Sequence, residues 1–159
     1  MTIESFLELI DATQTIDVYV DGACKGNPGM GGYGVFLNQN THKLETFGGE
    51  KETTNNRMEL LAPIKGLSMF PHPHILKVHT DSQYVRRGIT EWILKWKQNG
   101  WKTSKTGLVK NRDLWEELDR LNNIHKVEWV WVKGHDGIYG NELADALANK
   151  AVIAQNMSI

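Results

Sequence analysis

Three strand-like segments follow one another within the first fifty residues, and they constrain the fold more than any other feature. In the first, Ile16, Val18 and Val20 alternate with polar residues, so their aliphatic side chains share one face. The glycine-rich segment KGNPGMGG then predicts a turn, and residues 33–37 and 43–47 predict two further strands joined by NQNTH. Connections this short predict an antiparallel meander of three strands.

Helices and strands alternate through the rest of the chain. Pro63 lacks a backbone donor and should kink the first helix near Glu59. The order of elements predicts an α/β fold, with a mixed five-stranded sheet covered by helices and right-handed crossovers between parallel strands. The expected elements are a helix after the candidate caps Thr53 and Thr54, a strand at 75–80, a short helix from Ser82 that stops at Gly88, helices at 91–98 and 113–121, a strand at 127–132, and a helix from Asn141.

The size and composition of the chain indicate one soluble domain. With 159 residues, 40% of them hydrophobic, the chain can bury a single core. Charges interrupt every apolar run before the roughly 20 residues that a membrane helix needs. Residues 1–14 contain no Lys or Arg and so lack the positive start of a signal peptide. The one cysteine, Cys24, forms no internal disulfide. We therefore expect a cytoplasmic monomer with no membrane partner.

Residues 1–14 form an N-terminal extension ahead of the first strand. Ile3, Phe6, Leu7 and Ile10 recur at helical spacing within it. The extension could therefore pack as an extra helix, but the periodicity alone does not decide whether it does so.

Basic residues are concentrated in one segment of the chain. Residues 86–112 contain eight Lys or Arg residues and one Glu, a net charge of +7, whereas the whole chain carries −1 and the remainder therefore −8. Such an asymmetry indicates a local surface for a polyanion such as nucleic acid. A solvated helix face is the alternative interpretation of the same charges.

A glycine pattern, Gly29-x-Gly31-x-x-Gly34, matches the fingerprint of dinucleotide-binding proteins. That fingerprint requires the third glycine to enter a helix whose N-terminus binds pyrophosphate. Here Val35, Phe36 and Leu37 follow instead and predict a strand. The glycines therefore indicate tight backbone geometry and not a nucleotide site.

Four carboxylates occupy the ends of predicted elements. They are Asp21 at a strand end, Glu59 near a helix start, Asp81 at a strand end, and Asp145 in the last helix. Any one of them alone would be an ordinary surface residue, because charged side chains prefer water. In the predicted sheet order, however, all four positions can converge.

Five segments resemble the successive signature segments of bacterial ribonuclease HI, a type 1 ribonuclease H. They are YVDGACKGNPGMGGYG, TTNNRMELLA, TDSQYVRRGI, WKTSKTGLVKNRDLW and WVKGHDGIYGNELAD, which span Tyr19 to Asp145 in the order of the family. The resemblance implies a single ribonuclease H domain over residues 1–159, with residues 86–112 as a basic protrusion. It also implies endonucleolytic hydrolysis of the RNA strand of RNA/DNA hybrids, which leaves 5′-phosphate and 3′-hydroxyl ends.

The resemblance implies that Asp21, Glu59, Asp81 and Asp145 are catalytic and bind metal. Physical chemistry supports this choice, since gathered carboxylates repel one another and a hard cation such as Mg²⁺ relieves the repulsion. Two ions roughly 4 Å apart could activate a water and stabilise the departing O3′. Mn²⁺ is the alternative metal.

His135 matches the catalytic loop histidine of the family. Its loop contains Gly134, Gly137 and Gly140, which favours proton transfer or product release over a fixed ligand role. An incidental surface histidine is the alternative. Asp136 departs from the small neutral residue that is more usual in the family, so its charge could raise the pKa of His135.

Short polar side chains suit recognition of the 2′-hydroxyl, which distinguishes RNA from DNA. The family resemblance places one group of these residues along the RNA strand and another at the DNA phosphates. Turn formation or helix capping is the alternative role for each amide. The RNA-strand group is Cys24, Asn27, Asn55, Asn56 and Gln83, and the DNA-phosphate group is Thr54 and Asn111.

Tryptophans interleave with lysines in the basic protrusion, which is typical of a surface that stacks on bases and neutralises phosphates. The residues are Trp92, Lys95, Trp96, Lys97, Trp101 and Lys102. Core packing is the alternative for each ring, because Trp92 and Trp96 share one helix face. Trp115, Trp129 and Trp131 are expected in the core.

Two other classes of protein remain open from the sequence. One is a catalytically inactive module that only binds hybrids, although it would not need all four carboxylates. The other is a nuclease of related fold, such as an integrase or a resolvase, although the basic protrusion favours the hybrid enzyme.

Overall fold

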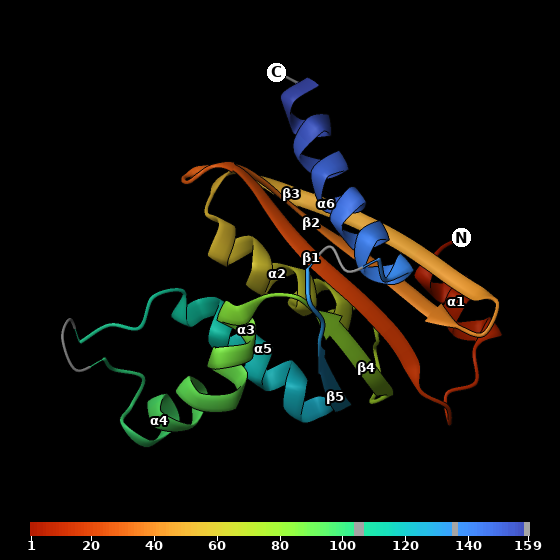
Figure 1. The fold of residues 1–159 in the computed structure, drawn as a ribbon. Coiled ribbons are helices and arrows are strands. Elements are labelled where there is room, and N and C mark those ends of the chain that lie inside the picture. The colour runs from red at the N-terminus through yellow and green to blue at the C-terminus, as the bar shows by residue number, and fades with distance from the viewer. Residues whose placement is uncertain (104–106, 135–136, 158–159) are drawn as a thin grey trace.

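A five-stranded sheet in the order β3-β2-β1-β4-β5 forms the centre of the molecule (Figure 1). The computed structural model describes residues 1–103, 107–134 and 137–157. Strands β1 (Ile16–Gly26), β2 (Gly29–Gln39) and β3 (His42–Thr53) form an antiparallel meander. Strand β4 (Ile75–Thr80) runs parallel to β1, and β5 (Lys126–Trp131) runs parallel to β4. The predicted mixed five-stranded sheet is thus confirmed.

The strands of the meander are longer than the sequence predicts. Most of the segment KGNPGMGG is strand and not turn, because β1 and β2 stay paired as far as Gly26 and Gly29. Pairing with β1 keeps Gly31 and Gly32 within β2, although glycine has little strand preference of its own. The prediction that residues 35–37 belong to a strand is confirmed, so the glycine pattern does not open a helix.

Helices cover both faces of the sheet. The alternation in β1 places Ile16, Val18 and Val20 in the core beneath α2 (Asn55–Ser68). Helix α5 (Arg112–Ile124) packs against α2 on that side. Helix α6 (Tyr139–Met157) crosses the other face over β1, β2 and β3 (Figure 1). Within the described ranges, no helix combines the length and apolar character needed to cross a membrane.

The N-terminal extension packs as a helix, α1 (Ile3–Leu9), whose first turn is capped by Thr2. Phe6 is fully buried. The side chain of Gln39 secures the connection to β1, because its Oε1 accepts from the Asp11 backbone N–H at 2.7 Å and its Nε2 donates to the Asp11 carbonyl at 2.8 Å. The extension is therefore part of the folded domain.

The prediction that Gly88 stops a helix is wrong. Helix α3 (Gln83–Arg87) continues through a π-helical turn, η1 (Gly88–Trp92), into α4 (Ile93–Gln98). Gly88 has helical angles, φ −63° and ψ −47°, so it does not act as a left-handed cap. A Cβ on Gly88 would overlap the indole ring of Trp115. This glycine permits close packing and does not end the helix.

Helix α2 contains Pro63 in its interior, where the proline is buried, and the helix continues to Ser68.

Candidate active site

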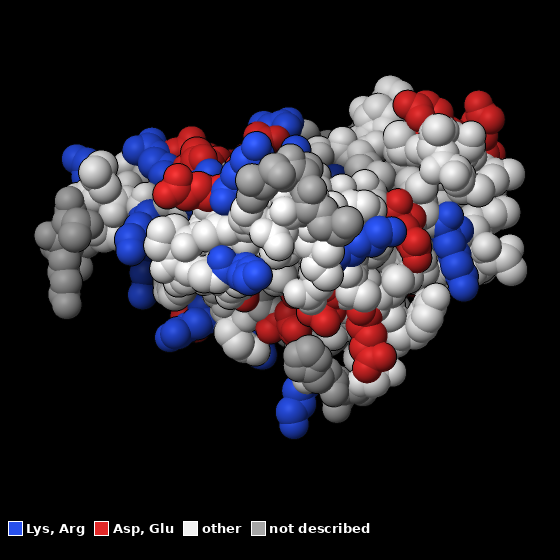
Figure 2. Space-filling view, turned by 90° about the horizontal axis from the view of Figure 1, so that it is seen from above, with Lys and Arg blue, Asp and Glu red and all other residues white. Residues whose placement is uncertain are grey.

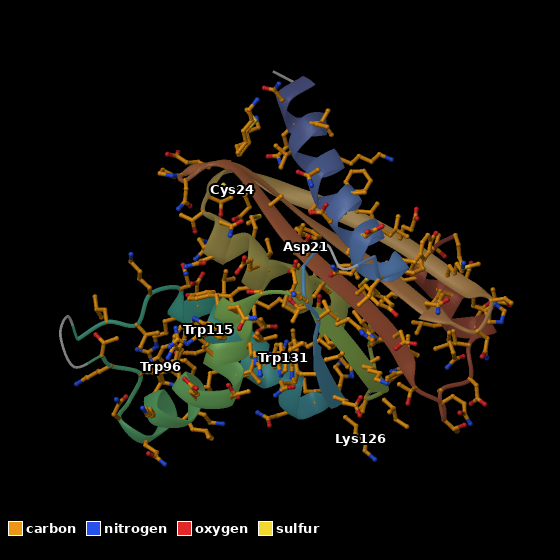
Figure 3. All side chains as sticks on the ribbon, viewed as in Figure 1. Asp21, Cys24, Trp96, Trp115, Lys126 and Trp131 are labelled. Atoms are coloured by element: carbon orange, nitrogen blue, oxygen red, sulfur yellow. The ribbon has the colours of Figure 1, made fainter. Side chains whose placement is uncertain are left out.

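The four carboxylates come from four different elements. Asp81 directly follows β4, Glu59 lies in the second turn of α2, and Asp145 lies in the second turn of α6. These three positions are as predicted. Asp21 does not end a strand, because β1 continues to Gly26. It lies just beyond the last residue of β1 that pairs with β4, where the two parallel strands separate (Figure 3).

Three aspartates meet beside the middle of the sheet. The side chain of Asp21 is hydrogen-bonded to Asp145 and interacts electrostatically with Asp81. Burial, followed by the charge of Asp81 and the contact with Asp145, raises the pKa of Asp21 to about 9. The backbone N–H of Gly22 donates to Asp21 at 2.9 Å and opposes this rise. At neutral pH the Asp21 carboxyl is therefore protonated.

Glu59 approaches the site from α2, which lies on the face of the sheet opposite to α6 and Asp145. Burial raises the pKa of Glu59, whereas hydrogen bonds from Ser82 Oγ (2.5 Å) and Asn55 Nδ2 (3.0 Å) oppose the rise. The charge of Asp81 further raises the pKa of Glu59. Helix α2 approaches β1 so closely that a Cβ on Gly22 would overlap the backbone of Met58 and Glu59. Gly22 thereby allows Glu59 to reach the aspartates.

The donors at this site are all carboxylate oxygens, which suits a hard divalent cation such as Mg²⁺. In the described ranges, no three or more His, Cys, Asp or Glu side chains are already arranged to hold a metal ion. A hydrogen bond through the protonated carboxyl of Asp21 instead joins Asp21 to Asp145, and the charge of Asp81 lies nearby. A divalent cation could replace that proton and relieve the same repulsion, so the donor set fits a metal.

The loop histidine of the sequence prediction, His135, and its neighbour Asp136 lie outside the described residues. The preceding residue, Gly134, lies beside the carboxylates, since a Cβ there would be 3.0 Å from Asp81 Oδ2.

Four of the residues predicted along the RNA strand lie around the start of α2 and the end of β1, whereas Gln83 begins α3. Asn27 Oδ1 accepts from the Asn55 backbone N–H at 3.1 Å, so this amide supports the helix start. Cys24 Sγ lies 3.5 Å from the Thr53 carbonyl oxygen (Figure 3). Asn56 and Gln83 are exposed. The amides of Asn27 and Asn55 thus have local structural roles whether or not they also meet RNA.

The residues predicted at the DNA phosphates belong to a connected network. Thr54 caps α2, since its Oγ1 accepts from the Arg57 backbone N–H at 3.2 Å. Asn111 Oδ1 accepts from Arg57 Nη1 at 3.2 Å, and Asn111 Nδ2 donates to Tyr84 Oη at 3.1 Å. Sequence patterns alone do not single out Arg57, Tyr84 or Ser82 as site residues. Their only signal in the sequence is that they lie within the segments TTNNR and TDSQY.

The tryptophans of the basic protrusion pack around Trp115, which is fully buried (Figure 3). Trp92 and Trp96 lie edge-on to its ring at 6.3 and 5.6 Å, and Trp101 stands against Trp96 at 5.8 Å. These three rings are partly buried against the core. This agrees with core packing, the alternative to base stacking for these tryptophans. Trp129 and Trp131 are also partly buried and stack on each other at 5.4 Å.

The lysines of the protrusion differ in their surroundings. Lys95 and Lys102 are exposed, whereas Lys97 Nζ forms an ion pair with Asp119 at 3.2 Å. Lys105 lies outside the described residues. In the view of Figure 2, many Lys and Arg side chains lie toward the end of the molecule that carries α4, with some acidic groups among them, and further acidic groups lie near the middle and at the opposite end.

The family model for RNase H matches residues 13–153 of the chain. The chain belongs to the ribonuclease H family. A ribonuclease H of Nitrosospira multiformis is 55% identical over 139 residues, which are 87% of this chain and 90% of the relative. The resemblance to bacterial ribonuclease HI is thereby confirmed, and the chain is an enzyme of the ribonuclease H class.

Solved ribonuclease H structures share the fold. One is LC9-RNase H1, described as a type 1 RNase H with the type 2 active-site motif. It superposes with a TM-score of 0.79 at 36% sequence identity, and the match covers 90% of this chain and 74% of the LC9-RNase H1 chain. LC11-RNase H1, solved in complex with an RNA/DNA hybrid, has a TM-score of 0.68 at 24% identity, over 89% of this chain and 99% of its own. Both place this ribonuclease H in the same structural class.

Proposed function

We propose that the carboxylate cluster hydrolyses the RNA strand of RNA/DNA hybrids with two divalent metal ions, leaving 5′-phosphate and 3′-hydroxyl ends. One observation carries the proposal: Asp21, Asp81 and Asp145 lie together in a partly buried place, where burial first, and then the charge of Asp81 and the hydrogen bond with Asp145, raise the pKa of Asp21 to about 9. Carboxylates this close together repel one another, and a bound divalent cation relieves the repulsion.

Asp21, Glu59, Asp81 and Asp145 would hold the metal. Bound there, two Mg²⁺ or Mn²⁺ ions would supply Lewis-acid activation of a water and of the phosphodiester. Asp21 and Asp145 present their carboxylates from β1 and α6, and Ser82 and Asn55 orient the Glu59 carboxylate. His135 would move a proton or help release the product, and its neighbour Gly134 lies beside Asp81.

Recognition of the hybrid would use both groups of polar residues around α2. Cys24, Asn27, Asn55, Asn56 and Gln83 would lie along the RNA strand, where they can read the 2′-hydroxyl. Thr54 and Asn111 would bind DNA phosphates. The exposed lysines of segment 86–112 would neutralise further phosphates, and Trp92, Trp96 and Trp101 would support that surface.

The organisation proposed for the enzyme is simple. Residues 1–159 would form one ribonuclease H domain that acts as a monomer in the cytoplasm. Size-exclusion chromatography with light scattering measures the oligomeric state, and a mass twice that of the chain would contradict the monomer.

Cleavage assays on three labelled substrates test the proposal. A hybrid, a DNA duplex and an RNA duplex are incubated with the protein and Mg²⁺, and the products are resolved on a gel. We expect cleavage of the RNA strand of the hybrid alone, with 3′-hydroxyl ends that a polymerase can extend. Binding without cleavage would indicate an inactive module, and cleavage of duplex DNA would indicate a different nuclease.

A further inference from the structure

Arg57, in the first turn of α2, contacts both residues that the proposed function assigns to the DNA strand. Its backbone N–H donates to Thr54 Oγ1 at 3.2 Å, and its Nη1 donates to Asn111 Oδ1 at 3.2 Å. Thr54 occupies the N-cap position of α2 and Asn111 that of α5, so these contacts involve the starts of two different helices. Arg57 therefore links the two predicted DNA-binding residues, Thr54 and Asn111, to each other.

The local conformation of Asn111 is unusual for the position it occupies. An asparagine at a helix N-cap ordinarily accepts a hydrogen bond from a backbone N–H of the first turn. Asn111 makes no such side-chain bond, and its backbone is left-handed at φ 59° and ψ 30°. Both features carry a local free-energy cost, and residues in such conformations cluster at functional sites. The amide of Asn111 is directed toward Arg57 and Tyr84 instead.

These contacts determine which atoms of Asn111 and Thr54 remain available. With Oδ1 held by Arg57, the amide group directs Nδ2 toward Tyr84 and keeps a second N–H. Thr54 Oγ1 accepts from Arg57 and keeps its hydroxyl hydrogen. In the described part of the chain, neither hydrogen has an acceptor. Two oriented donors beside one residue suit a phosphate oxygen.

Arg57 itself is not a free cation for that phosphate. Its Nη1 and Nη2 donate to the two carboxylate oxygens of Asp113 at 3.2 and 3.1 Å. The hydrogen bond with Asp113 raises the pKa of Arg57, and the charge of Glu50 adds to this rise. The guanidinium therefore directs its charge to neighbouring carboxylates, and its remaining contribution is geometric.

We propose that Arg57, anchored by Asp113, is a positioning residue that orients the free donors of Thr54 and Asn111 toward one phosphate of the DNA strand. Tyr84 holds the other side of the Asn111 amide. This inference deepens the proposed function and depends on it. The planar fork of arginine can bond Asp113 and Asn111 together, whereas the single nitrogen of lysine lacks this fixed geometry.

The test measures binding of RNA/DNA hybrids that each carry one neutral methylphosphonate in the DNA strand. Dissociation constants are measured by fluorescence anisotropy in EDTA, so that cleavage does not interfere. In the unmodified protein, we expect one DNA position at which the methylphosphonate raises Kd about tenfold, as removal of a charge-assisted hydrogen bond should.

Arg57→Lys keeps the positive charge and should bind the unmodified hybrid about tenfold more weakly. The methylphosphonate at the sensitive position should then raise Kd by less than about twofold, because the variant no longer bonds that phosphate. With Mg²⁺ and a cleavable hybrid, KM should rise while kcat stays unchanged. Asp113→Asn, which removes the anchor, is the second variant with the same expectation.

Arg120→Lys is the matched control, since Arg120 pairs with Glu117 on the exposed side of α5. It should retain both the affinity and the sensitive position. The inference is overturned if Arg57→Lys and Asp113→Asn keep the full methylphosphonate effect, or if the unmodified protein cleaves hybrids yet shows no sensitive DNA position. Failure of the unmodified protein to cleave a hybrid would instead contradict the proposed function.

Discussion

The hydroxyl of Ser82 donates a 2.5 Å hydrogen bond to Glu59 Oε2, and its oxygen accepts a 3.1 Å bond from the Val85 backbone N–H. Ser82 is buried, with 5% of its surface exposed. One side chain thus caps α3 and orients a carboxylate of α2.

Ser82→Ala should impair both functions of this residue. Loss of the cap should lower the free energy of unfolding by about 1 kcal/mol. Loss of the hydrogen bond should raise the pKa of Glu59, because that bond favours the charged form. The acidic limb of the pH–rate profile should therefore move to higher pH. Thr2→Ala removes the cap of α1 and is the control, with a similar stability loss and an unchanged profile.

Asp21→Asn should abolish cleavage and stabilise the protein in EDTA at pH 8. The pKa of Asp21 is about 9 in the folded protein and 3.8 as the ordinary value. Between these values the folded state binds the extra proton, so stability falls as pH rises from about 4 to about 9. Asparagine removes this dependence and should raise Tm by about 3 °C or more at pH 8. Melting curves from pH 5 to 9 measure it, and a pH dependence identical to that of the unmodified protein would contradict the assignment.

Replacing Lys95 and Lys102 together with Ala should weaken hybrid binding without slowing the chemical step. Removal of each lysine–phosphate interaction should reduce the slope of log K against log salt by a little under one unit, or nearly two units for the pair. Lys97→Ala should add less, because Asp119 already pairs with Lys97. KM should rise and kcat stay constant.

A salt titration of KM decides this prediction. The control is the pair Lys65→Ala and Lys126→Ala, which removes two exposed lysines outside segment 86–112. Parallel lines for the Lys95/Lys102 variant and the unmodified protein would mean that these lysines only solvate a helix face.

His125 should make the protein sensitive to mild acid. Its Nδ1 accepts from the His74 backbone N–H at 3.1 Å, so its Nε2 carries the hydrogen that is donated to the Leu67 carbonyl at 3.0 Å. Burial lowers the pKa of His125; the hydrogen bond to the Leu67 carbonyl opposes this effect, and the charge of His74 adds to it. The unfolded chain thus binds a proton below about pH 6.5 that the folded protein resists, and stability falls as pH drops from there through the lowered pKa.

Thermal melts between pH 7 and 5 test this dependence. His125→Gln should melt at a lower temperature at pH 7, yet lose less of its stability on acidification than the unmodified protein. His72→Gln, at an exposed position, should follow the unmodified protein. An unchanged acid dependence in His125→Gln would assign the effect to other groups.

The sequence predicts those parts of the site that depend on local pattern. Asp81 follows a short apolar strand, and Glu59 follows a capped helix start, so both positions can be predicted from spacing alone. The prediction that Asp21 ends a strand is wrong because pairing of β1 with β2 extends through glycines. Tertiary hydrogen bonds override the local preference at that position.

Other features depend on contacts between distant segments. Gly88 has the composition of a helix stop, but its neighbour in space is Trp115, which no local pattern reveals. The bond between Arg57 and Asn111 likewise joins α2 to the start of α5. The family resemblance predicts that Asn111 binds phosphate, whereas the residue that orients its amide can be found only in the folded structure.

The docking of α6 over β1–β3 has a consequence for biosynthesis. A nascent chain that has emerged only as far as β5 already contains Asp21, Glu59 and Asp81, but Asp145 is still inside the ribosome. Because α6 supplies the carboxyl that hydrogen-bonds to Asp21, the proposed metal site is completed only after the first turns of α6 have left the ribosome. Premature termination before α6 would yield a polypeptide with an uncovered sheet face and no nuclease activity.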